Sequence, residues 1–288
     1  MTLSMHKLTI CWPNLVDRFT LSGGSYTSAR PLDNAQVREL QERSRTADAA
    51  DASTQFLATF DQRRTVGCVA IAAHNLSTNA TVRIRVRDDG DDTVYDSGAL
   101  LAWPGLLGPE QLEWEDDNYW SGQLTAEMRA EYTPLFAHIF ESVVPAHSVL
   151  VEISDTGNAD GYVEFGRVFI GNVWQPAINM NYGSEWGHDD ATTVTETEGA
   201  GAEFFDEGPR RRTFACELAN LTASEAFNQL ARMQRVQGIS RELLIADELA
   251  QTPQSYQRTM LARLTSLNPI RHPYHRNWRK SIAAREIL

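Results

Sequence analysis

Residues 65–87 read TVGCVAIAAHNLSTNATVRIRVR, and this stretch decides the fold class. Residues 65–73 are apolar and rich in β-branched side chains, which is typical of a strand buried on both faces. Residues 80–87 alternate strictly, so that Val82, Ile84 and Val86 face one way and three arginines face the other, as in a strand with one solvated face. The acidic run 88–92 predicts a turn. The stretch therefore predicts two consecutive β-strands and a tight connection.

Further strand signals lie on both sides of this stretch. Residues 56–60, 148–155 and 162–170 are short runs that suit strands, and a turn-rich segment, 156–161, separates the last two. The strand–helix alternation that builds a parallel sheet is absent. Residues 1–175 therefore favour a β-sandwich or jelly roll.

Residues 103–147 are expected to form an insertion in this scaffold. Within them, residues 125–140 have a helical pattern that a proline limits to short pieces. Trp114, Tyr119 and Trp120 stand among acidic residues. Three interpretations are open: a loop anchored by its aromatics, a surface that binds a sugar or a protein, and glycoside hydrolysis by a carboxylate such as Glu113 or Asp116.

A second domain is predicted for residues 176–288, after the Trp-Gln-Pro boundary at 174–176. Residues 191–198 and 210–218 are expected to pair as a long antiparallel hairpin. A helix is predicted over 223–237, because Thr222 and Glu225 have the spacing of a capping box and Gly238 suits its end. A short strand at 243–246 and a basic C-terminal tail follow.

Charge is unevenly distributed along the 288 residues, whose net charge is -12. Residues 185–207 contain eight acids and no Lys or Arg, whereas residues 209–288 contain thirteen basic residues and six acids. A basic end on an acidic chain suits a nucleic-acid arm, a head-to-tail subunit contact or an ordinary solvated surface. A subunit-contact tail is favoured over nucleic-acid binding at 258–285, where aromatics are interleaved, because the acidic remainder repels DNA.

Catalytic, cofactor and metal motifs are not found. His74 is expected to be a structural residue of the turn after the buried strand, since no nucleophile elbow accompanies it. The acids at 88–92 lack the spacing of a calcium loop, and the His-Asp-Asp run at 188–190 lacks a metal-binding motif.

Cys11, Cys68 and Cys216 are expected in the core of a protein made in a reducing cytoplasm. Neither a secretory signal nor a membrane-spanning apolar run is read, so no membrane insertion is expected.

Two stretches of the first domain resemble a known module. Residues 66–85 contain an HNLS turn between a buried and an alternating strand, and residues 165–174 read FGRVFIGNVW. Both resemble the galactose-binding-like jelly rolls of phage virion proteins. The resemblance spans about residues 8–175 and leaves the insertion at 103–147 unexplained. The fold class that follows is mainly β: a galactose-binding-like jelly roll or β-sandwich plus a second small β domain with one helix.

The second domain resembles the distal tail protein family of siphophages. An arginine-led strand from Arg210, the helix over 223–237 and a strand ending at Asp247 carry this resemblance. It implies a structural, non-enzymatic component of a phage tail tip or baseplate that is made in the host cytoplasm and located in the virion. The implied homo-oligomer is a trimer or hexamer bound to other phage tail proteins. Subunit contacts are expected at Arg210, Arg211, Arg212, Arg276, Arg279 and Lys280.

The same resemblance implies that the acidic hairpin lines a lumen through which DNA passes, because acidic walls repel phosphate. The alternative function is a host-glycan-binding module that uses Trp114, Tyr119 and Trp120 for receptor binding. Glycan hydrolysis is the less favoured third function.

Overall fold

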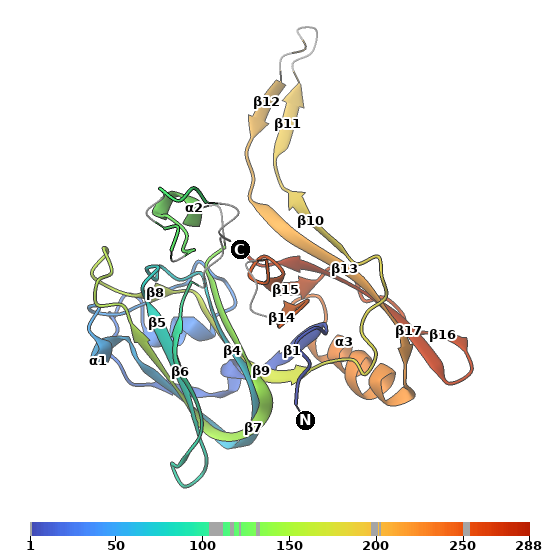
Figure 1. Ribbon diagram of the computed structural model, residues 1–288, viewed down its shortest axis with the longest axis horizontal. Helices are drawn as coiled ribbons and strands as arrows, with labels where there is room; N and C mark the ends of the chain where they lie inside the picture. The colour runs from blue at the N-terminus through green and yellow to red at the C-terminus, as the bar shows by residue number, and fades with distance from the viewer. Residues whose placement is uncertain are drawn as a thin grey trace. The chain divides into compact units, whose positions relative to one another are not determined.

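The computed structural model describes residues 2–103, 112–115, 118–120, 122–130, 133–196, 201, 203–249 and 254–288 (Figure 1). The chain forms two compact units. Unit 1 contains Met1–Gln175 and Leu243–Leu261, and unit 2 contains Pro176–Glu242 and Ala262–Leu288. The predicted second domain covers all of residues 176–288. Residues 243–261 instead belong to unit 1, because β14 (Glu242–Ala246) pairs with β1 (Thr9–Asn14).

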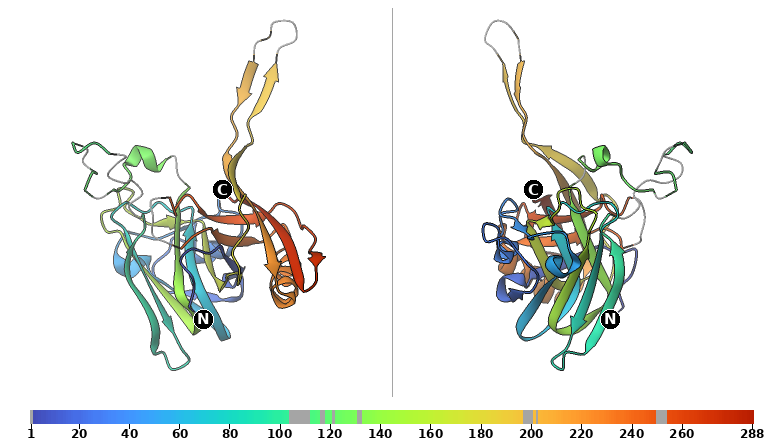
Figure 2. Two further views of the ribbon diagram at one scale, coloured as in Figure 1. Left: turned by 45° about the vertical axis from the view of Figure 1, so that its right-hand side comes forward. Right: turned by 90° about the vertical axis from the view of Figure 1, so that its left-hand side faces the viewer.

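Unit 1 is organised by two long strands, β4 (Phe56–Ala72) and β7 (Leu135–Ser154). The first half of β4 and the second half of β7 join a layer with β2 (Thr20–Ser22), β5 (Thr81–Arg87) and β6 (Thr93–Leu101). The other halves join a layer with β9 (Arg167–Trp174), β1 and β14. The register of the β4–β7 pair shifts between Thr59 and Arg64, where the strands pass from one layer to the other. The result is an antiparallel β-sandwich, which confirms the predicted fold class (Figure 2).

The core of unit 1 follows the predicted alternation. Val82, Ile84 and Val86 are fully buried, and β5 pairs on both sides, with β6 and β7. The second half of β4 is buried on both faces, as expected from its continuous apolar pattern. All three cysteines are buried, which confirms their assignment to the core. Short elements complete the unit: β3 (Ser44–Arg45), β8 (Glu164–Phe165), α1 (Asp51–Thr54), α2 (Ala126–Arg129) and the 3₁₀ helices η1 (Val16–Arg18) and η2 (Leu32–Gln36).

The predicted insertion at 103–147 is too long at its C-terminal end. Strand β7 begins at Leu135, so residues 135–147 belong to the sandwich. Among the described residues of the predicted stretch 125–140, only α2 is helical. The physical reason is long-range pairing: Phe136 lies opposite Ile71 of β4 and is buried. Local helical spacing was overridden by burial against a partner strand.

The two motifs behind the jelly-roll resemblance hold the fold together. In the HNLS turn, Ser77 donates both its backbone N–H and its hydroxyl to the carboxylate of Asp155, at 2.9 and 2.5 Å. In FGRVFIG, the Arg167 side chain is buried and donates to Asp17 Oδ1 at 2.5 Å. Gly166 lies so close to the backbone that an added Cβ would be 2.4 Å from the carbonyl oxygen of Leu40. These motif residues therefore stabilise the sandwich.

Unit 2 is built on an antiparallel sheet. Strand β13 (Arg210–Leu221) pairs with β10 (Glu185–Asp190) on one side and β17 (Asn277–Glu286) on the other. The end of β15 (Thr259–Leu264) and β16 (Arg271–Tyr274) also pair with β17. The basic tail is therefore a hairpin and an interior strand of the sheet.

The predicted helix of unit 2 is confirmed. A π-helical turn, η4 (Glu225–Ala231), continues into α3 (Arg232–Gln237). Thr222 and Glu225 form the predicted capping box, since the Thr222 backbone N–H donates to the Glu225 carboxylate at 2.9 Å and the Glu225 N–H donates to the Thr222 hydroxyl at 3.2 Å. Gly238 ends the helix with a φ of 55°. Within the described residues, no helix has the length and apolar character needed to cross a membrane.

Candidate functional site

The most distinctive feature of unit 2 is a two-stranded extension, which we call the arm. Strands β11 (Thr193–Glu196) and β12 (Glu203–Asp206) continue the β10–β13 pair and project away from the sheet of unit 2 (Figures 1 and 2). A long antiparallel hairpin is therefore present, as predicted, but the predicted pairing of residues 191–198 with 210–218 is wrong. Residues 193–196 pair with 203–206, and residues 210–215 pair with 185–190, because the chain turns back before residue 203. Residues 197 and 198, the end of the predicted strand 191–198, and residues 199, 200 and 202 lie outside the described residues.

The arm tip, β11 with β12, exposes large apolar side chains. Val194 is 54% exposed, Phe204 64% and Phe205 60%. Val194 lies opposite Phe205, and Glu196 lies opposite Glu203. Because side chains two residues apart share a face of a strand, these four form one face with an apolar pair next to an acidic pair. Such a face has the composition of a protein-binding surface.

The base of the arm is held by ion pairs. Arg210 donates from Nε to Asp190 at 3.2 Å, and Arg285 donates from Nη1 to Asp189 at 2.9 Å. Two acids of the His-Asp-Asp run therefore face arginines. Within the described part of the chain, no group of three or more His, Cys, Asp or Glu side chains is arranged to hold a metal ion.

Several predicted subunit-contact residues are engaged within unit 2. Arg212 donates to Glu286 from its backbone N–H and from Nε, at 3.0 and 2.9 Å, and both side chains are largely buried. Lys280 is 2% exposed and donates from Nζ to the Asn268 carbonyl at 2.8 Å. Burial lowers the pKa of Lys280 to about 8. Strand register turns both side chains inward, so Arg212 and Lys280 are engaged with residues of unit 2 itself.

The other predicted contact residues lie at the surface or at a pocket. Arg279 is 46% exposed and pairs with Glu217 at 2.6 Å. Arg276 is exposed at the β16–β17 turn with a φ of 56°. Arg210, paired with Asp190, is 73% exposed, and Arg211 lines a pocket of unit 2.

The aromatics of the basic segment contact one another. The rings of His272 and Trp278 stack at 4.2 Å between centroids, and Phe227 packs on Trp278 at 4.8 Å in a T-shaped arrangement. These rings therefore pack within unit 2, whereas Tyr274 is 76% exposed.

The predicted aromatic site lies in a partly described segment. Trp114 is 73% exposed and donates from its indole to Glu115 at 3.2 Å, and Trp120 is 86% exposed. Tyr119 lies against Trp120 in a T-shaped pair with ring centroids 5.2 Å apart. Glu113 is exposed, and Asp116 lies outside the described residues. The two exposed indoles are suited to stacking on a ligand.

His74 has the structural role expected for it. Its side chain is buried, and Nδ1 accepts the backbone N–H of Leu76 at 3.3 Å within the turn. Burial and, to a smaller extent, the nearby Arg129 lower the pKa of His74 to about 3. A histidine kept neutral in this way stabilises the turn as a hydrogen-bond acceptor.

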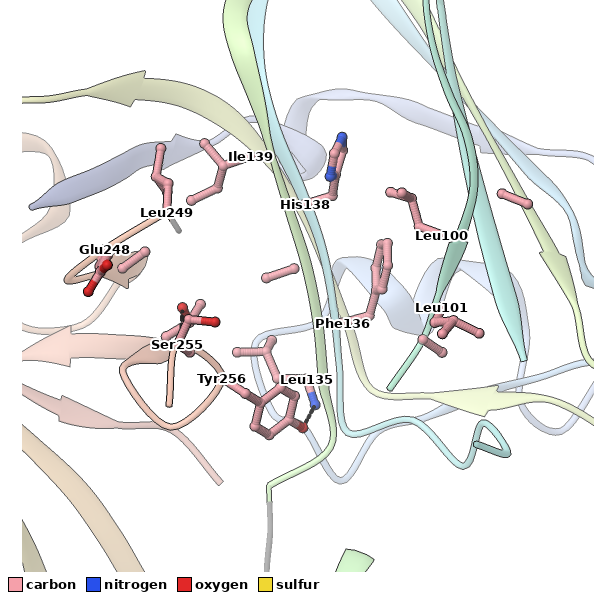
Figure 3. Close-up of a pocket in the computed structure, with 15 residues that line it drawn as sticks. Leu100, Leu101, Leu135, Phe136, His138, Ile139, Glu248, Leu249, Ser255 and Tyr256 are labelled. Carbon is pink, nitrogen blue, oxygen red and sulfur yellow. Dashed lines mark hydrogen bonds between the residues drawn. The ribbon is translucent and has the colours of Figure 1, made fainter. Parts of the chain in front are cut away.

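A pocket of about 520 Å³ lies in unit 1 beside β6, β7 and residues 246–249 and 255–259 (Figure 3). Its wall is mainly apolar and includes Leu100, Leu135 and Phe136. His138 faces it from β7, and its Nε2 hydrogen-bonds the hydroxyl of Tyr95 at 2.7 Å. The lining residues Leu100, Leu101, Leu135, Phe136, His138, Ile139, Glu248, Leu249, Ser255 and Tyr256 are labelled in Figure 3.

The polar groups of this pocket are already engaged. The Tyr256 hydroxyl donates to the Thr133 carbonyl at 2.7 Å and accepts the Leu135 N–H at 3.1 Å. Glu248 pairs with Arg258 at 2.8 Å. Among the described lining residues, Glu248 is the one acid, and it is engaged by this ion pair.

Comparison with known proteins gives a likeness of fold. No family model matches the chain, and no curated protein matches it. Among solved structures, the chain is similar to a family 32 carbohydrate-binding module from C. perfringens in complex with galactose, at 14% identity over 57% of this chain and 99% of that chain, with a TM-score of 0.38. It is also similar to a chitosan-binding module from Paenibacillus sp. IK-5, at 12% identity over 55% and 98% of the two chains, with a TM-score of 0.37.

A third solved structure is a fucose-binding module from Streptococcus pneumoniae, at 12% identity over 55% of this chain and 94% of that chain, with a TM-score of 0.36. The predicted class, mainly β with a sandwich, is confirmed by the strand pairing described above. At these identities and TM-scores, no ligand follows for this chain. None of the three structures is named as a phage protein, so the tail-tip resemblance stays a prediction.

Proposed function

We propose that the chain is a non-catalytic structural subunit of a larger assembly, of the kind that the tail-tip resemblance implies, and that it assembles through its arm. The observation that supports this proposal is the exposure of large apolar side chains at the arm tip, Val194 and Phe205 on one face and Phe204 on the other. A two-stranded ribbon is at best marginally stable by itself in water, and clustered exposed apolar side chains mark interaction sites. A partner that covers these rings would stabilise the arm.

We propose that this partner is a second copy of the chain. Residues 185–207, which include β10 at the base of the arm and both strands of its tip, contain acids but no Lys or Arg. The rest of unit 2 is rich in arginine. Charge complementarity of this kind favours head-to-tail contact between identical subunits. Such contacts close into a ring when the rotation between subunits permits it, which agrees with the expected trimer or hexamer. A place in a virion tail tip, other tail proteins as partners and DNA passage remain further parts of this proposal.

The test removes the apolar surface of the arm tip. The double substitution Phe204→Ser and Phe205→Ser is expected to convert an oligomer into a monomer, because the two rings are the largest exposed apolar groups of the tip. Light scattering after size-exclusion chromatography measures the mass. Ile178→Ser is the matched control, since its side chain is 56% exposed in unit 2 outside the arm, and it should keep the wild-type mass. A wild-type chain that is monomeric at every concentration contradicts the proposal.

A second candidate function is glycan binding by the exposed tryptophans. Trp120 and Trp114 present indole faces to solvent, and aromatic faces stack on sugar rings. Trp114→Ala combined with Trp120→Ala is expected to remove binding to any glycan that a glycan array detects for the wild type. Tyr274→Ala is the control, because Tyr274 is another exposed aromatic side chain. This variant should leave array binding unchanged. Equal array signals from the double variant and the wild type would exclude this surface.

A further inference from the structure

Unit 2 contains a pocket of about 420 Å³ whose wall carries three arginines. Arg211 comes from β13, Arg263 from β15 and Arg285 from β17. The remaining lining side chains are mainly apolar: Ile239, Leu264, Thr265, Ile287 and Leu288, together with Glu286. A small cavity lined by several guanidinium groups and by apolar side chains is suited to a ligand that is anionic and partly apolar.

Strand register places these arginines on one face of the sheet. Arg263 lies directly opposite Arg285, and Arg285 lies opposite Thr213. Arg211 is two residues before Thr213 on the same strand, so its side chain shares that face. Like charges directly opposite each other in a sheet are destabilising. The arrangement therefore leaves an excess of positive charge that an anion would neutralise.

Acidic side chains among the described residues do not neutralise all of the positive charge of this pocket. Asp189 engages Arg285 at 2.9 Å, and the Glu286 carboxylate is taken by Arg212. Arg211 and Arg263 have no ion-pair partner among the described residues, and Nε of Arg263 is buried without a hydrogen-bond acceptor. A buried donor without an acceptor is costly, and a carboxylate that enters the pocket would satisfy it.

The arm tip carries the complementary pattern. Glu196 lies opposite Glu203, so two carboxylates are side by side, and the neighbouring pair on the same face is Val194 with Phe205. Both glutamates are exposed, and neither has a cationic partner among the described residues. The two carboxylates of the tip complement the arginines of the pocket in charge. The apolar pair beside them complements the apolar side chains that also line the pocket.

The tip cannot reach the pocket of its own chain. Asp189 lies opposite Arg211 at the base of the arm. Glu196 is seven residues farther along, which is about 23 Å at the ordinary rise of a strand. We therefore propose that the arginine pocket of one copy binds the Glu196–Glu203 carboxylate pair of a second copy. This rests on the proposed function and specifies the subunit contact as head-to-tail.

The test exchanges the charges. Glu196→Arg with Glu203→Arg reverses the tip, and Arg211→Glu with Arg263→Glu reverses the pocket while leaving the Arg285–Asp189 pair in place. Each double variant is expected to associate about 100-fold more weakly than the wild type, because like charges then meet at the contact. The chain with all four substitutions is expected to recover association. Sedimentation velocity at low salt measures the association, and circular dichroism confirms that each variant is folded.

The outcomes separate this inference from the proposed function. If the wild type assembles, the Phe204 and Phe205 variant does not, and charge reversal has no effect, then the arm is the contact but the arginine pocket is not its receptor. If both double variants are monomeric and the quadruple variant stays monomeric, the tip carboxylates do not meet the arginine pocket, and the proposed contact is overturned. If the wild type itself is monomeric, both the inference and the proposed function fail.

Discussion

Replacing Asp155 by alanine is expected to lower the free energy of unfolding of unit 1 by about 3 kcal/mol. The Asp155 side chain is 4% exposed and accepts three hydrogen bonds. Two come from Ser77, through its N–H at 2.9 Å and its hydroxyl at 2.5 Å, and one comes from Asn158 Nδ2 at 2.7 Å. Alanine leaves these donors without their acceptor in a largely buried turn. Urea denaturation followed by circular dichroism measures the change.

Two companion variants make this prediction specific. Asp155→Asn keeps one carboxamide oxygen as acceptor, so its loss should be smaller than that of alanine. Asp160→Ala, which removes an exposed carboxylate bonded to Asn75 at 2.8 Å, should cost less than about 1 kcal/mol. Equal losses for Asp155→Ala and Asp160→Ala would show that the HNLS turn is not anchored by the buried carboxylate.

Local patterns were sufficient for parts of this fold. The alternation at 82–86 predicted which side of β5 is buried, because one register of a strand determines the face of every residue. The capping box at Thr222 predicted the start of the helix, since its two hydrogen bonds join residues three apart in the sequence. In both cases the determining interaction is short in sequence or repeats with the period of the element.

Other features depend on pairing across long separations. Strand β14 belongs to unit 1 because Ile10 lies opposite Ile245, and nothing local to residues 243–246 indicates that partner. The start of β7 was missed because residues 125–140 have helical spacing, while Phe136 is buried by β4. Tertiary pairing overrode local preference in both places.

The candidate site was predictable only in composition. Residues 185–207 are acidic and residues 209–288 are basic, and this contrast indicated subunit contacts. The sequence did not distinguish Arg212, which is bonded to Glu286, from Arg211, whose side chain lines the pocket. Arg263 was not predicted as a contact residue, because its position opposite Arg285 arises only from the β15–β17 register.

Lowering the pH is expected to destabilise unit 1 through His138. Burial lowers the pKa of His138 from 6.5 to about 4. Above pH 6.5 this histidine is neutral in both the folded and the unfolded chain and has no effect on pH dependence. Below pH 6.5 the unfolded chain gains a proton that the folded chain does not, so stability falls as the pH decreases toward about 4. Linkage gives a loss of about 2 kcal/mol between pH 6.5 and pH 5.

His138→Gln isolates this contribution, because glutamine does not titrate and keeps a group able to hydrogen-bond the Tyr95 hydroxyl, which lies 2.7 Å from His138 Nε2. The difference in unfolding free energy between pH 7 and pH 5, measured by urea denaturation, is expected to be about 2 kcal/mol smaller in the variant than in the wild type. His6→Gln, at a side chain that is 79% exposed, should keep the wild-type difference. An unchanged difference in His138→Gln would mean that His138 takes up its proton in the folded chain, so that the pocket beside β7 admits water and charge more readily than its apolar wall indicates.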